Sequence, residues 1–197
     1  MNAVKTLRQR VIVVRQGQQF EIDQSIVYPD KQVQKISLPQ GKLLRVVSPT
    51  VAFTVIGTQV LDLPPIERTS SRVALKHDFI NVLQHVNKAN YRFSAIRNER
   101  VGDAEASVLD VNADGVQTRW WIGADGKLLQ ERFTAVEDDG ATTQTMKYSK
   151  WKSFSGLEYP TKYEMFSDAG PSRLSMTLAA MEVNVAVDPK VFEKPPK

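Results

Sequence analysis

Four turn signals in the second half of the chain constrain its fold more than any other feature. They are NADG at residues 112–115, GADG at 123–126, EDDG at 137–140 and SDAG at 167–170, each set between runs of alternating apolar and polar residues. Asp-Gly turns between alternating runs are typical of β-hairpins. The pattern predicts a long antiparallel meander, and similar alternating runs in the first 63 residues predict further strands.

Between these two sets of strands, the spacing of the apolar residues changes to that of a helix. They fall on one helix face, at Leu75, Phe79, Val82, Leu83 and Val86. We therefore expect one main amphipathic helix over residues 72–87. No linker divides the chain, and its 197 residues are enough for one core, so we predict a single mainly β domain of the α+β class over residues 1–197.

The segment RWWIGADGKLLQERF, residues 119–133, places Trp120 and Trp121 side by side in a predicted hairpin. Neighbouring residues in a strand point to opposite faces of the sheet. One indole is therefore expected to face the core or a ligand, and the other to face water or a partner.

The register of the strands decides which tryptophan faces inward. Three-residue loops at 124–126 and 138–140 would place Arg119, Glu131 and Lys147 side by side on one face. A cross-strand ladder of alternating charge suits a face exposed to water. The second tryptophan belongs to this face, so we predict that the first points inward and the second outward. A slip of one residue would reverse the assignment.

The same register gives the inward face an apolar and aromatic lining that includes one arginine, Arg132. An unpaired arginine is costly in a packed core, so Arg132 either pairs with an acid or lines a partly open cavity. Methionine and aromatic side chains suit a soft apolar ligand, although they could equally pack against the helix. The candidate ligand-binding residues are Trp120, Ile122, Arg132, Met146, Tyr148, Tyr163, Met165, Phe79 and Leu83.

The sequence carries no recognisable catalytic or metal motif. It contains no cysteine, and its two histidines, His77 and His85, are eight residues apart, which is not the spacing of a zinc-binding helix. Glycine-rich phosphate loops and nucleophile-elbow motifs are absent. The net charge of +4 comes without a dense basic run, so nucleic acid is not an expected partner. We predict no catalytic residue, no metal and no cofactor.

Spaced aromatic, glycine and proline residues of the meander resemble the LolA/LolB-like superfamily of outer-membrane lipoprotein-sorting proteins. The matching positions are Trp121, Asp125, Leu128, Tyr148, Trp151, Gly156 and Pro160. The resemblance implies an unclosed antiparallel β-barrel, or half-barrel, with the helix on its concave face. It also implies a periplasmic binding protein without catalysis, whose apolar cavity holds a lipid or a lipoprotein acyl chain.

A second resemblance is to LolA-like domains attached to pitrilysin/insulinase-type zinc peptidases. The abrupt start and the lack of a signal-type apolar stretch fit such an excised domain. This alternative implies an accessory protein-interaction domain of a larger envelope protein. Its expected partner contacts are two outward tryptophans, Trp121 and Trp151.

Overall fold

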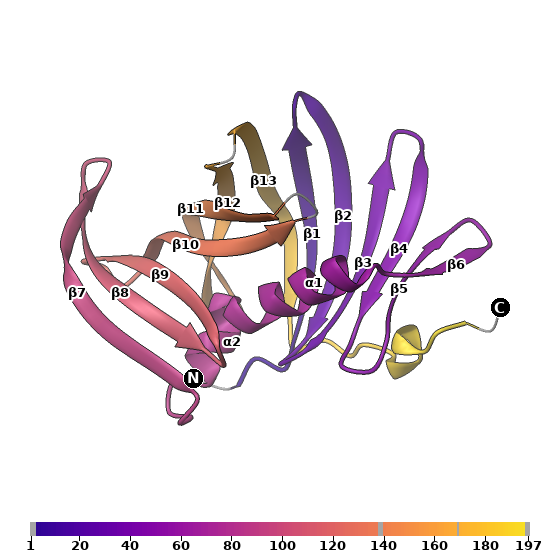
Figure 1. The fold of residues 1–197 in the computed structure, drawn as a ribbon, viewed down its shortest axis with the longest axis horizontal. Coiled ribbons are helices and arrows are strands. Elements are labelled where there is room, and N and C mark those ends of the chain that lie inside the picture. Colours follow the sequence, from indigo (N-terminus) through magenta and orange to yellow (C-terminus); the bar gives the residue numbers. More distant parts are fainter. Residues whose placement is uncertain (1–2, 138–139, 169, 196–197) are drawn as a thin grey trace.

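The computed structural model describes residues 3–137, 140–168 and 170–195. One antiparallel sheet of thirteen strands curves around two helices (Figure 1). Its strands are β1 (Thr6–Arg15), β2 (Gln18–Val27), β3 (Lys31–Leu38), β4 (Gly41–Val47), β5 (Ala52–Ile56), β6 (Gln59–Asp62), β7 (Tyr91–Val101), β8 (Ala104–Ala113), β9 (Val116–Gly123), β10 (Leu128–Glu137), β11 (Gly140–Phe154), β12 (Leu157–Ser167) and β13 (Gly170–Val183). The helices are α1 (Pro65–His77) and α2 (Phe79–Gln84), and a 3₁₀ turn, η1 (Pro189–Phe192), follows the last strand.

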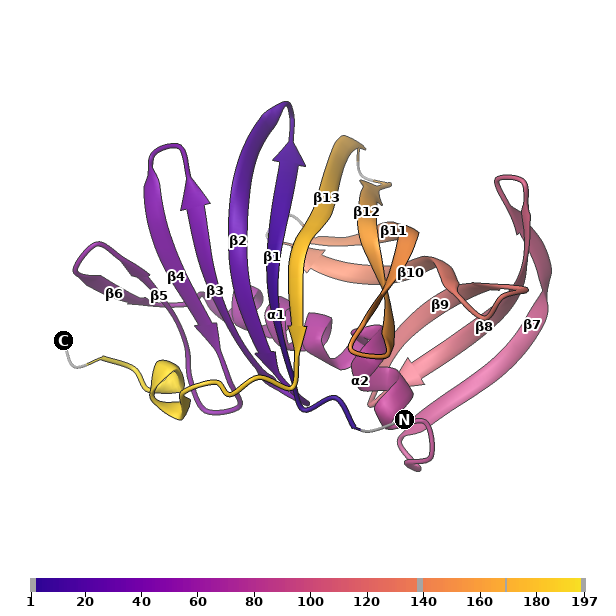
Figure 2. The same ribbon diagram turned by 180° about the vertical axis from the view of Figure 1, so that it is seen from behind.

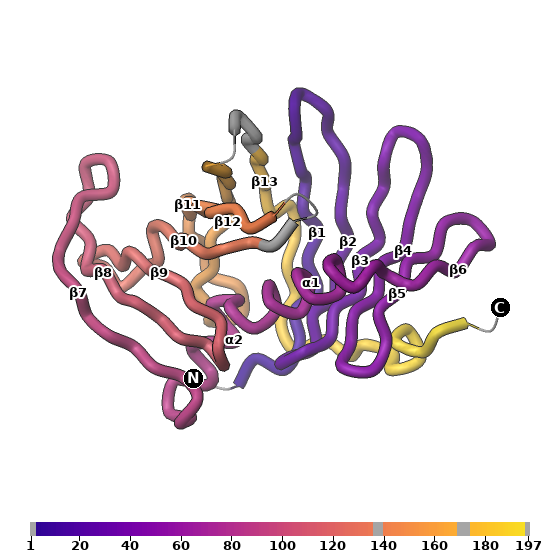
Figure 3. Tube along the Cα trace, in the orientation of Figure 1, coloured from indigo at the N-terminus to yellow at the C-terminus, as the bar shows by residue number. Residues whose placement is uncertain are grey.

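The sheet consists of two meanders, which are joined where the first strand of the chain, β1, lies beside the last, β13. The strand order runs from β6 down to β1 and then from β13 down to β7, so β1 hydrogen-bonds to β13 (Figure 3). The two edges, β6 and β7, are connected through the helices. No ladder joins β6 to β7 within the described residues, which confirms the predicted unclosed half-barrel with helix on its concave face.

The predicted single helix over residues 72–87 is two shorter helices. The first begins at Pro65, because proline fits the first turn of a helix. It ends at Asp78, whose extended backbone (ψ 127°) interrupts the helical hydrogen bonds. Phe79 and Val82 are buried as expected, but Leu83 remains 47% exposed. Neither helix of the described chain is long and apolar enough to cross a membrane.

The predicted register of the central hairpin is correct at its first pair and wrong beyond it. Ile122 pairs with Leu128 as expected, but one extra residue at Leu129 shifts the register, so that Glu131 pairs with Trp120. A bulge of one residue moves every following side chain to the opposite face. Glu131 therefore lies on the concave side rather than on the wet face.

The predicted charge ladder is accordingly not formed. Arg119 lies opposite Arg132 in the ladder and pairs instead with Asp110, with 2.8 Å between Nε and the carboxylate. Lys147 lies opposite Gln130 rather than Glu131. Residues 138–139 of the predicted turn at 138–140 lie outside the described residues, as does residue 169 of the turn at 167–170.

The main core and a smaller cluster around Leu75 lie between the concave face and the helices, and two further clusters cover the convex face. Trp120 belongs to the concave core, and Trp121 packs on the convex side against Ala106, Val108 and Leu129. The inward and outward directions of the two tryptophans are thus as predicted. The C-terminal tail crosses the convex side, where Phe192 packs on a cluster around Phe53 (Figure 2).

Candidate functional site

The break between the two helices positions the side chains at the centre of the concave face. The Asp78 carboxylate caps α2 by accepting hydrogen bonds from the backbone N–H groups of Ile80 (3.1 Å) and Asn81 (3.2 Å). It also accepts a hydrogen bond of 2.8 Å from the hydroxyl of Tyr28, the residue that follows β2. Burial raises the pKa of Asp78 above its ordinary value. The cap therefore fixes where His77 and Phe79, its two neighbours, enter the interior.

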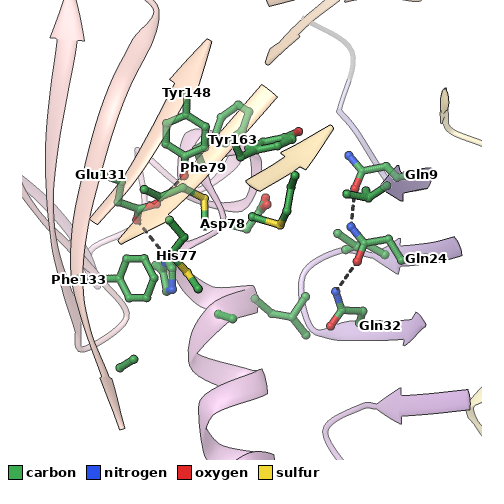
Figure 4. Close-up of a pocket in the computed structure, with 18 of the residues that line it drawn as sticks. Gln9, Gln24, Gln32, His77, Asp78, Phe79, Glu131, Phe133, Tyr148 and Tyr163 are labelled. Atoms are coloured by element: carbon green, nitrogen blue, oxygen red, sulfur yellow. Dashed lines mark hydrogen bonds and ion pairs between the residues drawn. The ribbon is translucent and has the colours of Figure 1, made fainter. Parts of the chain in front are cut away.

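A first cavity of about 410 Å³ lies between α1 and the sheet (Figure 4). Its volume is within the range of about 300–1,000 Å³ typical of small-molecule sites. Ala74 of α1 lines this cavity and is also exposed to solvent, so the cavity is open beside the helix. Eight of its twenty lining residues are methionine, phenylalanine or tyrosine: Phe79, Phe133, Met146, Tyr148, Tyr159, Tyr163, Met165 and Met176.

A buried carboxylate, Glu131, stands at one end of the first cavity. It is 2% exposed and lies 3.0 Å from Nδ1 of His77. It also accepts hydrogen bonds from the hydroxyl of Tyr148 (2.8 Å) and the indole N–H of Trp120 (3.3 Å). These four side chains form what we call the carboxylate cluster. Each of these three bonds joins Glu131 of β10 to a different element, so the cluster ties α1 to β9, β10 and β11.

Glu131 favours the protonated form of His77. Burial alone would lower the pKa of His77, but the charge and hydrogen bond of Glu131 outweigh burial and raise that pKa above 6.5. Burial and the nearby carboxylate raise the pKa of Tyr148 well above its ordinary value, so its phenol stays neutral.

The opposite wall of the first cavity is polar but uncharged. Gln9, Gln24 and Gln32 lie in a row across β1, β2 and β3 (Figure 4). The amide of Gln24 donates to Oε1 of Gln9 at 2.6 Å, and that of Gln32 donates to Oε1 of Gln24 at 3.1 Å. We call these three residues the amide row.

A second cavity of about 360 Å³ lies on the other side of Phe79. Trp120, Ile122 and Leu83 line it together with Trp151. The ring of Phe79 lines both cavities and contacts Tyr159 and Trp151, with centroid separations of 5.2 and 6.0 Å. Phe79 is therefore the partition between the two spaces.

The structure distributes the predicted ligand-binding residues over these two cavities. Met146, Tyr148, Tyr163 and Met165 line the first cavity, and Phe79 lines both. The second cavity takes Trp120, Ile122 and Leu83.

The predicted inward direction of Arg132 is wrong. The bulge at Leu129 turns Arg132 to the convex side, where it is exposed and lines a shallow depression with Arg119. The charged side chain that points to the apolar face is instead Glu131, which is paired with the other members of the carboxylate cluster.

The predicted exposure of the two contact tryptophans is also wrong. Trp121 is 6% exposed, and its indole N–H donates to Glu99 at 2.8 Å. Trp151 packs against the concave core and lines the second cavity, directly after Lys150, whose φ is positive at 56°. Neither indole forms an exposed patch.

The sequence interpretation overlooked the polar members of the first cavity. Gln9 and Gln24 occupy inward positions in strands whose other inward residues include Val11 and Ile26. A glutamine within an apolar stripe was the available signal. Among the described residues, no group of three or more His, Asp or Glu side chains could hold a metal ion.

Comparison with known proteins found no matching protein-family model and no matching curated protein. Solved structures do match over nearly the whole chain. A LolA superfamily protein from Nitrosomonas europaea shares 11% identity, with 98% of this chain and 92% of that chain covered and a TM-score of 0.66. This chain has the LolA-like fold.

Two further structures show the same LolA-like fold. A domain named as an outer membrane lipoprotein-sorting protein domain, from Vibrio parahaemolyticus, shares 12% identity, covers 96% of this chain and 89% of its own, and has a TM-score of 0.62. A DUF1329 family protein from Desulfovibrio piger shares 9% identity, with coverages of 98% and 91% and a TM-score of 0.61. At these identities the likeness establishes the fold.

Proposed function

We propose that the protein is a non-catalytic binding protein of the periplasm that holds an apolar ligand, a lipid or a lipoprotein acyl chain, in its concave face. The observation that carries this proposal is the first cavity, whose wall of methionine and aromatic side chains opens to solvent beside α1. Thioethers and aromatic rings adapt to flexible apolar chains. Each buried CH₂ group of such a chain contributes about 0.8 kcal/mol.

The fold supports the same proposal. The solved structures with the LolA-like fold include one named as a domain of a lipoprotein-sorting protein. A half-barrel with helices on its concave face can hold an apolar chain between two layers without closing around it. We propose the periplasmic location and the carrier role on the basis of this likeness.

The test is binding of the uncharged fluorophore N-phenylnaphthylamine, combined with native mass spectrometry of the purified protein before and after delipidation. We expect an adduct of lipid mass that is lost on delipidation, and saturable binding of the fluorophore afterwards. The variant Ala135→Phe, which places a ring into the first cavity, should weaken binding of the fluorophore about tenfold or more.

The matched control is Ala180→Phe, which adds the same ring at an exposed position of β13. It should bind the fluorophore like the unmodified protein. A delipidated protein that takes up no fluorophore, or equal binding by both variants, would overturn the proposal that this cavity is the binding site.

A further inference from the structure

The amide row gives the first cavity a polar wall that an acyl chain alone does not need. Gln9 is 2% exposed, and its Nε2 meets the thioether of Met181 at 3.6 Å, which is a weak acceptor. Gln34 adds a further bond to the row by donating to Oε1 of Gln24 at 3.1 Å. Burying amides is unfavourable unless they are hydrogen-bonded. The row is therefore an organised feature of the wall.

The amides keep capacity for further hydrogen bonds. Each side-chain amide has two N–H donors and an oxygen that accepts two bonds. Oε1 of Gln24 accepts from two neighbours, and its amide nitrogen donates to Gln9. The phenols of Tyr159 and Tyr163 line the same cavity. The row and the adjoining phenols thus present uncharged donors and acceptors to the cavity.

The charges around the first cavity disfavour an anion inside it. Its charged lining residues in the described chain are His77, Asp78 and Glu131, and no lysine or arginine lines it. His77 is already paired with Glu131, which leaves Asp78 without an opposing charge in the lining. A carboxylate or phosphate placed here would lose its hydration and face a carboxylate.

The first cavity is also a poor site for a cation. Glu131 is occupied by His77, Tyr148 and Trp120. The carboxylate of Asp78 accepts from Tyr28 and from the first backbone N–H groups of α2. These three bonds to Asp78 all end on Oδ1. An ammonium group in the cavity would lose its hydration and could gain only the other oxygen of Asp78 in return, whereas the amide row offers several uncharged donors and acceptors.

We infer that the first cavity selects an uncharged amphiphile, in which an acyl chain carries a hydroxyl, ester or amide group that hydrogen-bonds to the amide row. The chain lies along the methionine and aromatic wall, and the polar group meets Gln24 and its neighbours. This inference rests on the proposed function and specifies its ligand class.

The test uses three competitors with the same lauroyl chain and different head groups. The competitors are monolauroylglycerol, lauric acid and laurylamine. The experiment measures how well each displaces N-phenylnaphthylamine from the delipidated protein at about pH 7.5, where the last two are charged. We expect monolauroylglycerol to displace the fluorophore at concentrations about tenfold lower than either charged competitor.

A variant tests the amide row directly. Gln24→Leu should lower the affinity for monolauroylglycerol about tenfold relative to that for the fluorophore, because the ligand's polar group then faces a methyl group. The matched control Gln117→Leu changes an exposed glutamine of β9 and should leave this ratio unchanged.

The outcomes separate the two proposals. Failure of the fluorophore to bind at all would count against the proposed function. Normal binding of the fluorophore, with lauric acid or laurylamine displacing it as well as monolauroylglycerol does, would overturn the inference about the ligand class and leave the proposed function standing. An unchanged ratio in Gln24→Leu would likewise overturn it.

Discussion

At the scale of single residues, Glu131 shows how one buried charge can organise a site. It is 2% exposed, and partners from three other elements surround it. A buried ion pair is weak evidence for stability when both partners are present, because desolvation offsets their attraction. Removing one partner is costly, because it leaves the other charged and unpaired.

Replacing Glu131 by glutamine should therefore destabilise the protein by about 3 kcal/mol near pH 6. The effect should shrink with rising pH. Because the folded-state pKa of His77 is raised above 6.5, its contribution is fully present below pH 6.5 and is lost as the pH rises through the folded value. Urea unfolding between about pH 6 and 9 measures both quantities.

The control for this prediction is Glu158→Gln, which removes an exposed carboxylate from β12. Its stability should follow that of the unmodified protein at every pH. If Glu131→Gln keeps the fall in stability above pH 6.5, then the His77–Glu131 pair is not its source.

At the scale of elements, the sequence predicts strands and turns better than faces. The turn at residues 123–126 was predicted from its Asp-Gly pair, and Gly126 does adopt a positive φ of 79°. The faces of β9, and those of β11 as far as Tyr148, followed from alternation. Those of β10 did not, because the bulge at Leu129, between Leu128 and Gln130, has no signature of its own in the sequence. This single extra residue explains why Glu131 was missed and Arg132 was wrongly chosen.

The helix break was also hidden from the apolar pattern. Leu75 and Phe79 keep a spacing of four, although the backbone between them is not helical at Asp78. The one sequence signal for the break is Asp78 itself, because aspartate is a common N-cap whose carboxylate accepts from the first free backbone N–H groups of a helix.

Asp78→Ala should destabilise the protein by about 2 kcal/mol, because it removes the cap of α2 and leaves the hydroxyl of Tyr28 without its acceptor. Hydrogen exchange at the amides of Ile80 and Asn81 should accelerate. The comparison variant is Tyr28→Phe, which removes the side-chain bond and keeps the cap, at a cost of about 1 kcal/mol. Equal exchange in both variants would show that the cap does not hold the start of α2.

At the scale of the whole molecule, the ring of one residue divides the hollow of the concave face into two cavities. The first and second cavities, of about 410 and 360 Å³, meet at Phe79. Alternation in the strands predicted six residues of this lining, which are Trp120, Ile122, Met146, Tyr148, Tyr163 and Met165. The division into two cavities depends on where the short helix α2 places its first side chain, Phe79. The alternation of residues in the strands does not predict that position.

Phe79→Ala should join the two cavities at a cost of about 3–5 kcal/mol in stability. We expect the preferred acyl chain to become longer, measured by displacement of N-phenylnaphthylamine with a series of monoacylglycerols. The matched control is Phe53→Ala, which empties a buried site of the convex cluster. A similar change in chain-length preference in both variants would mean that loss of stability, rather than the missing partition, causes it.

The pairing of β1 with β13 also sets the order in which this molecule can fold. Leu7 pairs with Val183, and the backbone N–H of Lys5 donates to the side chain of Asn184 at 2.7 Å. During synthesis β1 leaves the ribosome long before its partner exists, so one of its edges stays open until the last strand has been made. Contacts this distant in the sequence make folding slow. The nascent chain thus exposes an unpaired strand edge, which can aggregate, for most of its synthesis. A chaperone that covers β1 during this period would prevent that aggregation.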